Sequence, residues 1–94
     1  GGRTMTKKIA VLIRDRQSEA LRMSLGLTLL DDSIEAFVLD SELEKTEQNM
    51  DNIELMTELD VNIYSNNTKN EDLRHMPFQE IALQLVEYDH ILVY

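Results

Sequence analysis

The chain has 94 residues, of which 43% are hydrophobic and 29% are charged. This length and composition predict one small soluble globular domain. Eighteen acidic against nine basic side chains give a net charge of -9, which argues against binding to nucleic acids or to anionic membranes, because both carry the same sign of charge. No apolar run reaches the roughly 18 to 20 residues that cross a bilayer.

The N-terminal residues Gly1-Gly2-Arg3-Thr4 read as an expression scar before a native start at Met5, so we expect a single domain over residues 5–94. They contain no hydrophobic signal region. The chain has no cysteine, which excludes disulfides, thiolate metal sites and thiol redox chemistry. We therefore expect a cytoplasmic protein.

The first half of the chain alternates between strand and helix patterns. Residues 8–13 form a short apolar run that is typical of a strand covered on both faces. Ser18 is the predicted N-cap of a helix over residues 20–30, in which apolar residues cover most of the circumference and predict deep packing. Gly26 in this helix costs about 1 kcal/mol relative to alanine, so we expect another backbone to approach it closely.

The same alternation continues to residue 64. Asp31-Asp32-Ser33 are the predicted turn into a strand over residues 34–39. Residues 41–49 read as a loop or a frayed helix start, and Asp51 with Glu54 has the spacing of a capping box. The helix that follows carries one apolar face, and a strand is predicted over residues 61–64. That apolar face consists of Met50, Ile53, Met56 and Leu59.

The last third holds the strongest amphipathic pattern. Residues 65–70 are a predicted loop, with His75 as an alternative end, and Pro77 suits the first position of a helix because it has no amide hydrogen. The apolar stripe of this helix consists of Phe78, Ile81, Ala82, Leu85 and Val86. A final strand is predicted over residues 90–94. The whole order predicts a three-layer α/β/α sandwich with a mostly parallel sheet of four strands or slightly more.

Parallel sheets bind ligands beyond the carboxyl ends of their strands. We call the candidate residues at these ends the strand-end rim, which consists of Arg14, Asp15, Asp40, Ser65, Asn66 and Asn67. A glycine-rich phosphate loop is absent, and so we expect no nucleotide cofactor. His75 and His90 lack the spacing of a helical metal site. Ser65 is a nucleophile only if a base activates it, so we predict no catalytic residue.

Several sequence segments within residues 7–94 resemble segments of the DsrE/DsrF-like sulfur-relay proteins. They are the opening strand at residues 8–13, the first helix from Glu19-Ala20-Leu21 to Leu30, the second strand over 34–40, the helix-then-strand unit over 53–63 and the closing strand over 88–94. The resemblance implies a DsrE-like or flavodoxin-like fold. It also implies assembly into homo-oligomers or mixed oligomers with related subunits.

The chain departs from the family at the position of the cysteine that carries the transferred sulfur. The sulfur-carrying cysteine would fall at Ser65 or Asn66, and neither residue can form a persulfide. In the mixed complexes of this family, some subunits lack the working cysteine and serve as structural partners. The leading hypothesis is therefore a non-catalytic oligomeric subunit or binding module. The alternative is a small-ligand-binding protein or an enzyme that uses the strand-end rim as a polar pocket.

Overall fold

The chain alternates between strands and helices in the predicted order, with one short additional strand. The computed structural model describes residues 7–29 and 33–94. Its elements are β1 (Lys8–Ile13), α1 (Gln17–Thr28), β2 (Ser33–Val38), α2 (Glu47–Glu58), β3 (Asn62–Ser65), β4 (Arg74–His75), α3 (Phe78–Gln84), the 3-10 turn η1 (Leu85–Glu87) and β5 (His90–Val93).

The strands form one five-stranded sheet in the order β4-β3-β2-β1-β5. Each of the four neighbouring pairs is parallel, so the α/β class and the parallel sheet are confirmed. β1 lies between two neighbours, with Ile9 opposite Ile34 of β2 and opposite His90 of β5. The additional strand is β4, which falls inside the segment predicted as a loop. The sequence analysis missed it because two residues are too few to show an alternating pattern.

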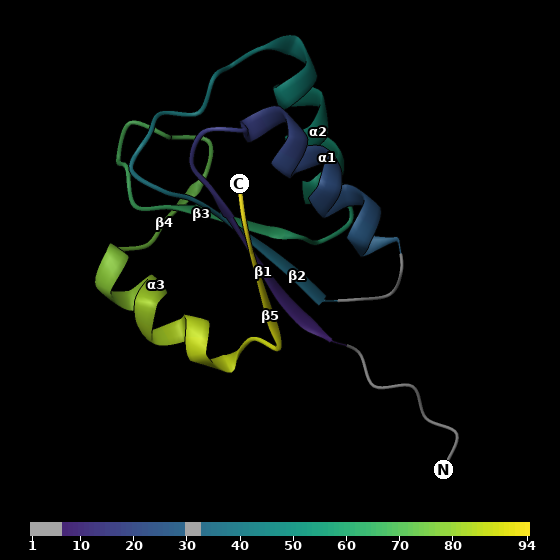
Figure 1. Ribbon diagram of the computed structural model, residues 1–94. Helices are drawn as coiled ribbons and strands as arrows, with labels where there is room; N and C mark the ends of the chain where they lie inside the picture. The colour runs from purple at the N-terminus through teal and green to yellow at the C-terminus, as the bar shows by residue number, and fades with distance from the viewer. Residues whose placement is uncertain (1–6, 30–32) are drawn as a thin grey trace.

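Helices cover both faces of the sheet (Figure 1), so the structure has three layers. α1 and α2 pack side by side on one face, over a core that includes Val11, Leu21, Ala36, Met56 and Ile63. α3 lies on the other face over a smaller core of Ala10, Phe37, Leu39, Met76 and Ile81. The strands read as nearly unbroken apolar runs because both faces of the sheet are covered.

α1 differs from its predicted form in its start and its packing. It begins at Gln17, with Arg16 at the cap position and no side-chain cap, so the prediction of Ser18 as N-cap is wrong. Deep packing around the whole helix is also wrong, because Met23 is 44% exposed. A Cβ atom built on Gly26 meets no atom within 4 Å. Within residues 7–29 and 33–94, no backbone from outside α1 approaches this glycine, contrary to the prediction.

α2 begins four residues before the predicted capping box. The Thr46 hydroxyl accepts a hydrogen bond from the backbone N–H of Asn49 at 3.1 Å. Asp51 and Glu54 therefore lie inside the helix rather than at its start. The predicted apolar face is largely confirmed, with Ile53 and Met56 buried, whereas Leu59 is 40% exposed at the C-terminal end of the helix.

α3 begins one residue after Pro77, whose carbonyl accepts hydrogen bonds from the N–H groups of Glu80 and Ile81. The predicted apolar stripe is only half covered. Ile81 is fully buried, whereas Phe78 and Val86 are exposed. The sheet meets one side of α3, and no described element packs on the other side.

Some predictions concern residues outside the described ranges. These are the scar and start at residues 1–5, the end of the first helix at Leu30, and the turn residues Asp31 and Asp32. Within the described ranges, no helix combines the length and the apolar character that crossing a bilayer would require.

Candidate functional site

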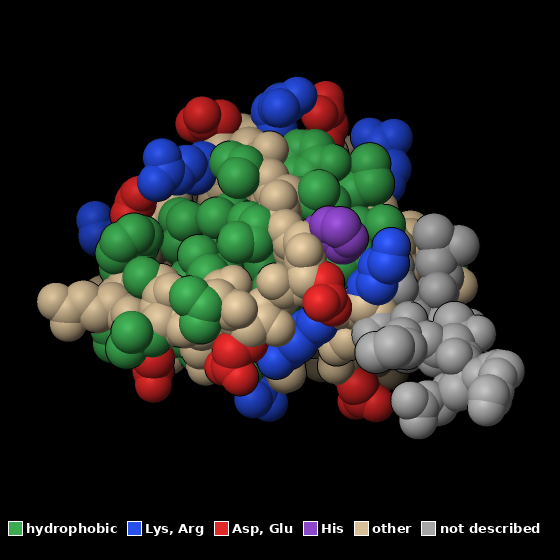
Figure 2. All heavy atoms as spheres, turned by 60° about the horizontal axis from the view of Figure 1, so that its bottom comes forward, with side chains coloured by type: hydrophobic (Ala, Val, Ile, Leu, Met, Phe, Trp, Pro, Cys, Tyr) green, Lys and Arg blue, Asp and Glu red, His purple; other side chains and the backbone are tan. Residues whose placement is uncertain are grey.

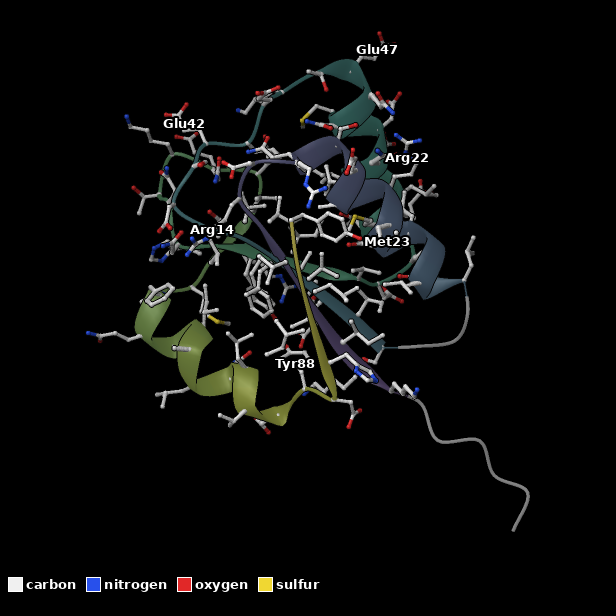
Figure 3. All side chains as sticks on the ribbon, viewed as in Figure 1. Arg14, Arg22, Met23, Glu42, Glu47 and Tyr88 are labelled. Atoms are coloured by element: carbon white, nitrogen blue, oxygen red, sulfur yellow. The ribbon has the colours of Figure 1, made fainter. Side chains whose placement is uncertain are left out.

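The carboxyl ends of the neighbouring parallel strands β1, β2 and β3 lie side by side at one end of the sheet, as predicted. Arg14 follows β1, and its guanidinium nitrogen lies 3.9 Å from a carboxylate oxygen of Asp40, which follows β2. Figure 3 shows Arg14 at this end of the sheet. The two side chains are 54% and 62% exposed, so the ion pair contributes little to stability.

Asp40 is tied to the loop after β3. It has a positive φ of 66°, a backbone conformation that asparagine and aspartate adopt more readily than most residues. Its N–H donates to Asn66 Oδ1 at 2.7 Å, and Asn66 Nδ2 donates to its carboxylate at 2.9 Å. Asn67 Nδ2 donates to its carbonyl at 3.2 Å. Both amides are thus used to join two loops of the rim.

Ser65 occupies the strand end where a relay cysteine would lie, and it is 1% exposed. Its hydroxyl oxygen accepts hydrogen bonds from the Asn67 N–H at 3.0 Å and from Asn70 Nδ2 at 2.8 Å. Activation of a serine requires a base that accepts its proton. No such acceptor bonds to this hydroxyl among the described residues, and the arrangement is that of a turn.

Asp15 is the one rim residue that the structure does not bring to this cluster. Its N–H donates to the Tyr94 carbonyl at 3.2 Å, next to the bond from the Arg14 N–H at 2.7 Å. Its side chain lines a different hollow, of about 380 Å³, between the starts of α1 and α2. Five of the six predicted rim residues therefore lie together, and Asp15 lies apart.

Two buried amides that hold the loop over residues 41–44 were missed by the sequence analysis. Asn70 accepts from the Leu43 N–H at 2.7 Å and donates to the Ser41 carbonyl at 3.0 Å as well as to Ser65. Gln17 donates to the Glu42 carbonyl at 3.1 Å and accepts from the Glu44 N–H at 2.8 Å. Apart from the Ser65 hydroxyl, their partners are backbone groups of residues 41–44, so no pattern of side chains in the sequence reveals them.

A second polar cluster lies on the face of the sheet that α3 covers. One carboxylate oxygen of Glu35 accepts from Tyr64 and from Asn62, each at 3.4 Å, and the other accepts a hydrogen bond from the Tyr88 hydroxyl. Figure 3 shows Tyr88 between α3 and the sheet. Phe37 stacks on Tyr64 with ring centroids 5.4 Å apart and meets Tyr88 edge-on at 6.1 Å.

The environment of this cluster keeps both phenols protonated. Burial, the hydrogen bond to Glu35 and the charge of that carboxylate raise the pKa of Tyr88 well above its ordinary value. Burial and the same carboxylate also raise the pKa of Tyr64. A neutral phenol donates to the carboxylate, whereas a phenolate beside it would be repelled. Across residues 7–29 and 33–94, no three His, Asp or Glu side chains are grouped as a metal ion would require.

The third feature is an apolar surface, which we call the α3–β5 surface. Figure 2 shows hydrophobic side chains gathered on the side of the molecule that carries α3. The surface consists of Phe78 (51% exposed), Leu83 (74%), Val86 (84%), Ile91 (44%) and Val93 (61%). Isolated exposed apolar residues are ordinary, whereas the largest apolar patch on a small domain is often functional.

Known proteins add nothing to this description. Comparisons with protein-family models, with curated proteins and with solved structures find no match to the chain.

Proposed function

We propose that this protein is a non-catalytic binding module that works as a subunit of an assembly. The observation that carries the proposal is the α3–β5 surface. At their exposed fractions, its five side chains together present on the order of 500 Å² to solvent, which falls in the range of roughly 300–600 Å² for the largest apolar patch of a typical monomer, and such a patch is often functional. Association would remove this apolar area from water.

The hydrogen bonding within the strand-end rim supports a non-catalytic role. Ser65 is buried and accepts two hydrogen bonds, and the amides of Asn66 and Asn67 are bonded to Asp40. We also propose that the chain is related to the DsrE-like proteins, because the order of its elements and several of its sequence segments resemble theirs. In that case the chain would supply structure rather than sulfur transfer, because it has no cysteine.

The proposal is tested by comparing the mass of the assembled species formed by the gently purified protein with that formed by a variant that carries added charges on α3. We expect native mass spectrometry and sedimentation velocity at micromolar concentration to show association with itself or with a related subunit. Leu83→Glu combined with Val86→Glu should abolish it, because the charges would have to be buried. Leu29→Glu is the matched control, since Leu29 is 75% exposed at the end of α1. A wild-type monomer that binds no partner would contradict the proposal.

A second candidate function is small-ligand binding at the rim, favoured by the exposure of Arg14 and Asp40. These opposite charges lie 3.9 Å apart at the edge where parallel sheets bind ligands. Arg14→Ala and Asn66→Ala separate the two functions. Loss of a bound small-molecule mass with assembly intact would favour the pocket, whereas loss of assembly would not.

A further inference from the structure

On one face of the sheet, α3 and η1 form the only helical cover among residues 7–29 and 33–94. In Figure 1 they run from the end of β4 to the start of β5. On the other face, α1 and α2 pack against each other as well as against the sheet. α1 buries four side chains and α2 buries three, whereas α3 buries only Ile81 and η1 buries none. The α3 layer is therefore held by much less packing.

α3 also has little stability of its own. It has seven residues, whereas isolated helices shorter than about 12–15 residues are marginal in water. Pro77 at its cap position provides no side-chain hydrogen bond to the first turn. The helical form of α3 and η1 thus depends on the sheet, where Ile81 and the half-buried Leu85 pack on the core that contains Phe37.

The chain before α3 is fixed to the sheet. Met76 is buried, and its N–H donates to the Ser65 carbonyl at 2.9 Å, so it continues the pairing of β4 with β3. Pro77 separates this residue from the first residue of α3. We call Met76 the first anchor, and it keeps its contacts whether or not α3 is formed.

The chain after η1 is fixed by two further residues, which we call the second anchor. The Tyr88 hydroxyl donates to Glu35 of β2. The Asp89 N–H donates to the Lys8 carbonyl at 2.7 Å, and the Asp89 carboxylate accepts from the Lys8 N–H at 2.8 Å. The two ends of the α3–η1 segment are therefore tied to the sheet more firmly than its middle.

We propose that residues 78–87 are a strap that opens by local unfolding between the two anchors, while the sheet and the α1–α2 layer stay folded. Segments with few buried apolar contacts open at a lower free energy than the whole fold. Opening removes Ile81 from the core that it shares with Phe37 and exposes part of that core to water. The motion belongs to the single chain, and so it goes beyond the proposed function.

Three backbone amides provide a matched measure of this opening. The N–H groups of Ala20, Met50 and Ile81 are each the fourth of their helix, and each donates to the carbonyl of the cap residue at 3.0 Å. Ala20 and Ile81 also have fully buried side chains. The folded structure alone would protect these amides alike, so a difference in hydrogen exchange, corrected for intrinsic rates, reports local opening.

The first test is hydrogen exchange of the full chain, read at single residues by mass spectrometry below the concentration at which sedimentation velocity shows association. We expect the Ile81 N–H to exchange at least ~10-fold faster than those of Ala20 and Met50. Urea well below the unfolding midpoint should accelerate exchange at Ala20 but barely at Ile81, because a local opening exposes little surface. Equal protection and equal urea dependence at the three amides would overturn the strap.

A substitution in the opposite core separates the strap from the rest of the fold. Met56→Ala removes a fully buried side chain beneath α1 and α2. It should accelerate exchange at Ala20 by at least ~30-fold and leave Ile81 unchanged, because the closed and the open strap both keep this core. Ile63→Val is a milder change in the same core, with the same expected pattern at smaller size. Equal acceleration at Ala20 and Ile81 would show that α3 opens only with the whole fold.

Ile81→Ala tests the side chain that holds the strap closed. It should accelerate exchange by at least ~30-fold at the Leu85 N–H, which donates to the carbonyl of residue 81. Leu83→Ala is the matched control, because Leu83 is 74% exposed on the same helix, and it should change this rate little. Equal effects of the two variants would contradict the role of Ile81. A rigid α3 in an assembled protein overturns the strap and leaves the proposed function standing, whereas a mobile strap in a strict monomer does the reverse.

Discussion

At the scale of single residues, Asn70 decides the form of the rim. Its side chain is 6% exposed and bonds to the backbone of residues 41 and 43 and to the Ser65 hydroxyl. Asn70→Ala leaves the Leu43 N–H and the Ser41 carbonyl without these partners, so we expect it to lower the free energy of unfolding by about 1–3 kcal/mol. Urea denaturation measures this loss. Thr68→Ala, at an exposed position of the same loop, is the control and should change stability by less than about 0.5 kcal/mol.

Tyr88 makes stability depend on alkaline pH. Its pKa in the folded protein lies above the ordinary value of 10.0 that it has in the unfolded chain, chiefly because of burial and then Glu35. The stabilisation is therefore present below about pH 10 and is lost as the pH rises through the folded pKa, because the unfolded state loses its proton first.

Tyr88→Phe should weaken this dependence and lower stability at pH 7 by about 1 kcal/mol through loss of the hydrogen bond. Chemical denaturation at pH 8 and about pH 11 tests both statements, with tyrosinate absorbance as a second readout. An equal loss of stability with pH in the variant and in the wild type would contradict this assignment.

At the scale of elements, the difference between α1 as predicted and as observed has a physical cause. A run of leucines shows that a helix is apolar but not which sides have neighbours, and among the described elements α1 packs chiefly against α2 and the sheet. Gly26→Ala adds a methyl group in open space and improves helix propensity. We expect it to raise the free energy of unfolding by up to ~1 kcal/mol, measured by thermal denaturation. A loss of stability would show that a neighbour does contact this position.

α3 illustrates the same point for function. Its stripe of Phe78, Ile81, Ala82, Leu85 and Val86 is helical in period, as predicted. The period identifies a helix, but the tertiary structure decides that Ile81 is buried and Val86 is 84% exposed. Two residues of the α3–β5 surface, Phe78 and Val86, were therefore visible in the sequence as part of a core stripe, and their exposure was not.

At the scale of the whole molecule, the net charge of -9 opposes association of two copies. Salt screens this repulsion, so the dimer dissociation constant should fall by roughly 3–10-fold between about 0.05 and 0.5 M NaCl. Sedimentation velocity at both salt concentrations measures the change, and Leu83→Glu combined with Val86→Glu should remain largely monomeric at each. Weaker association at high salt would indicate ion pairs across the contact instead.

The sequence by itself determined the order of strands and helices, the parallel sheet and the edge at which Arg14, Asp40 and Ser65–Asn67 meet. These properties follow from local periodicity and from the rule that parallel strands end at one edge. The absence of cysteine equally settled which chemistry the chain lacks.

Only the tertiary structure decided the sheet order, the two-residue strand β4, the anchoring of residues 41–44 by Gln17 and Asn70, and the exposure of the α3–β5 surface. Each of these depends on contacts between segments far apart in the chain, such as the Asn70 amide and the backbone of residues 41–43. Local propensity carries no information about such contacts, because they are fixed by which faces of the helices and sheet find neighbours.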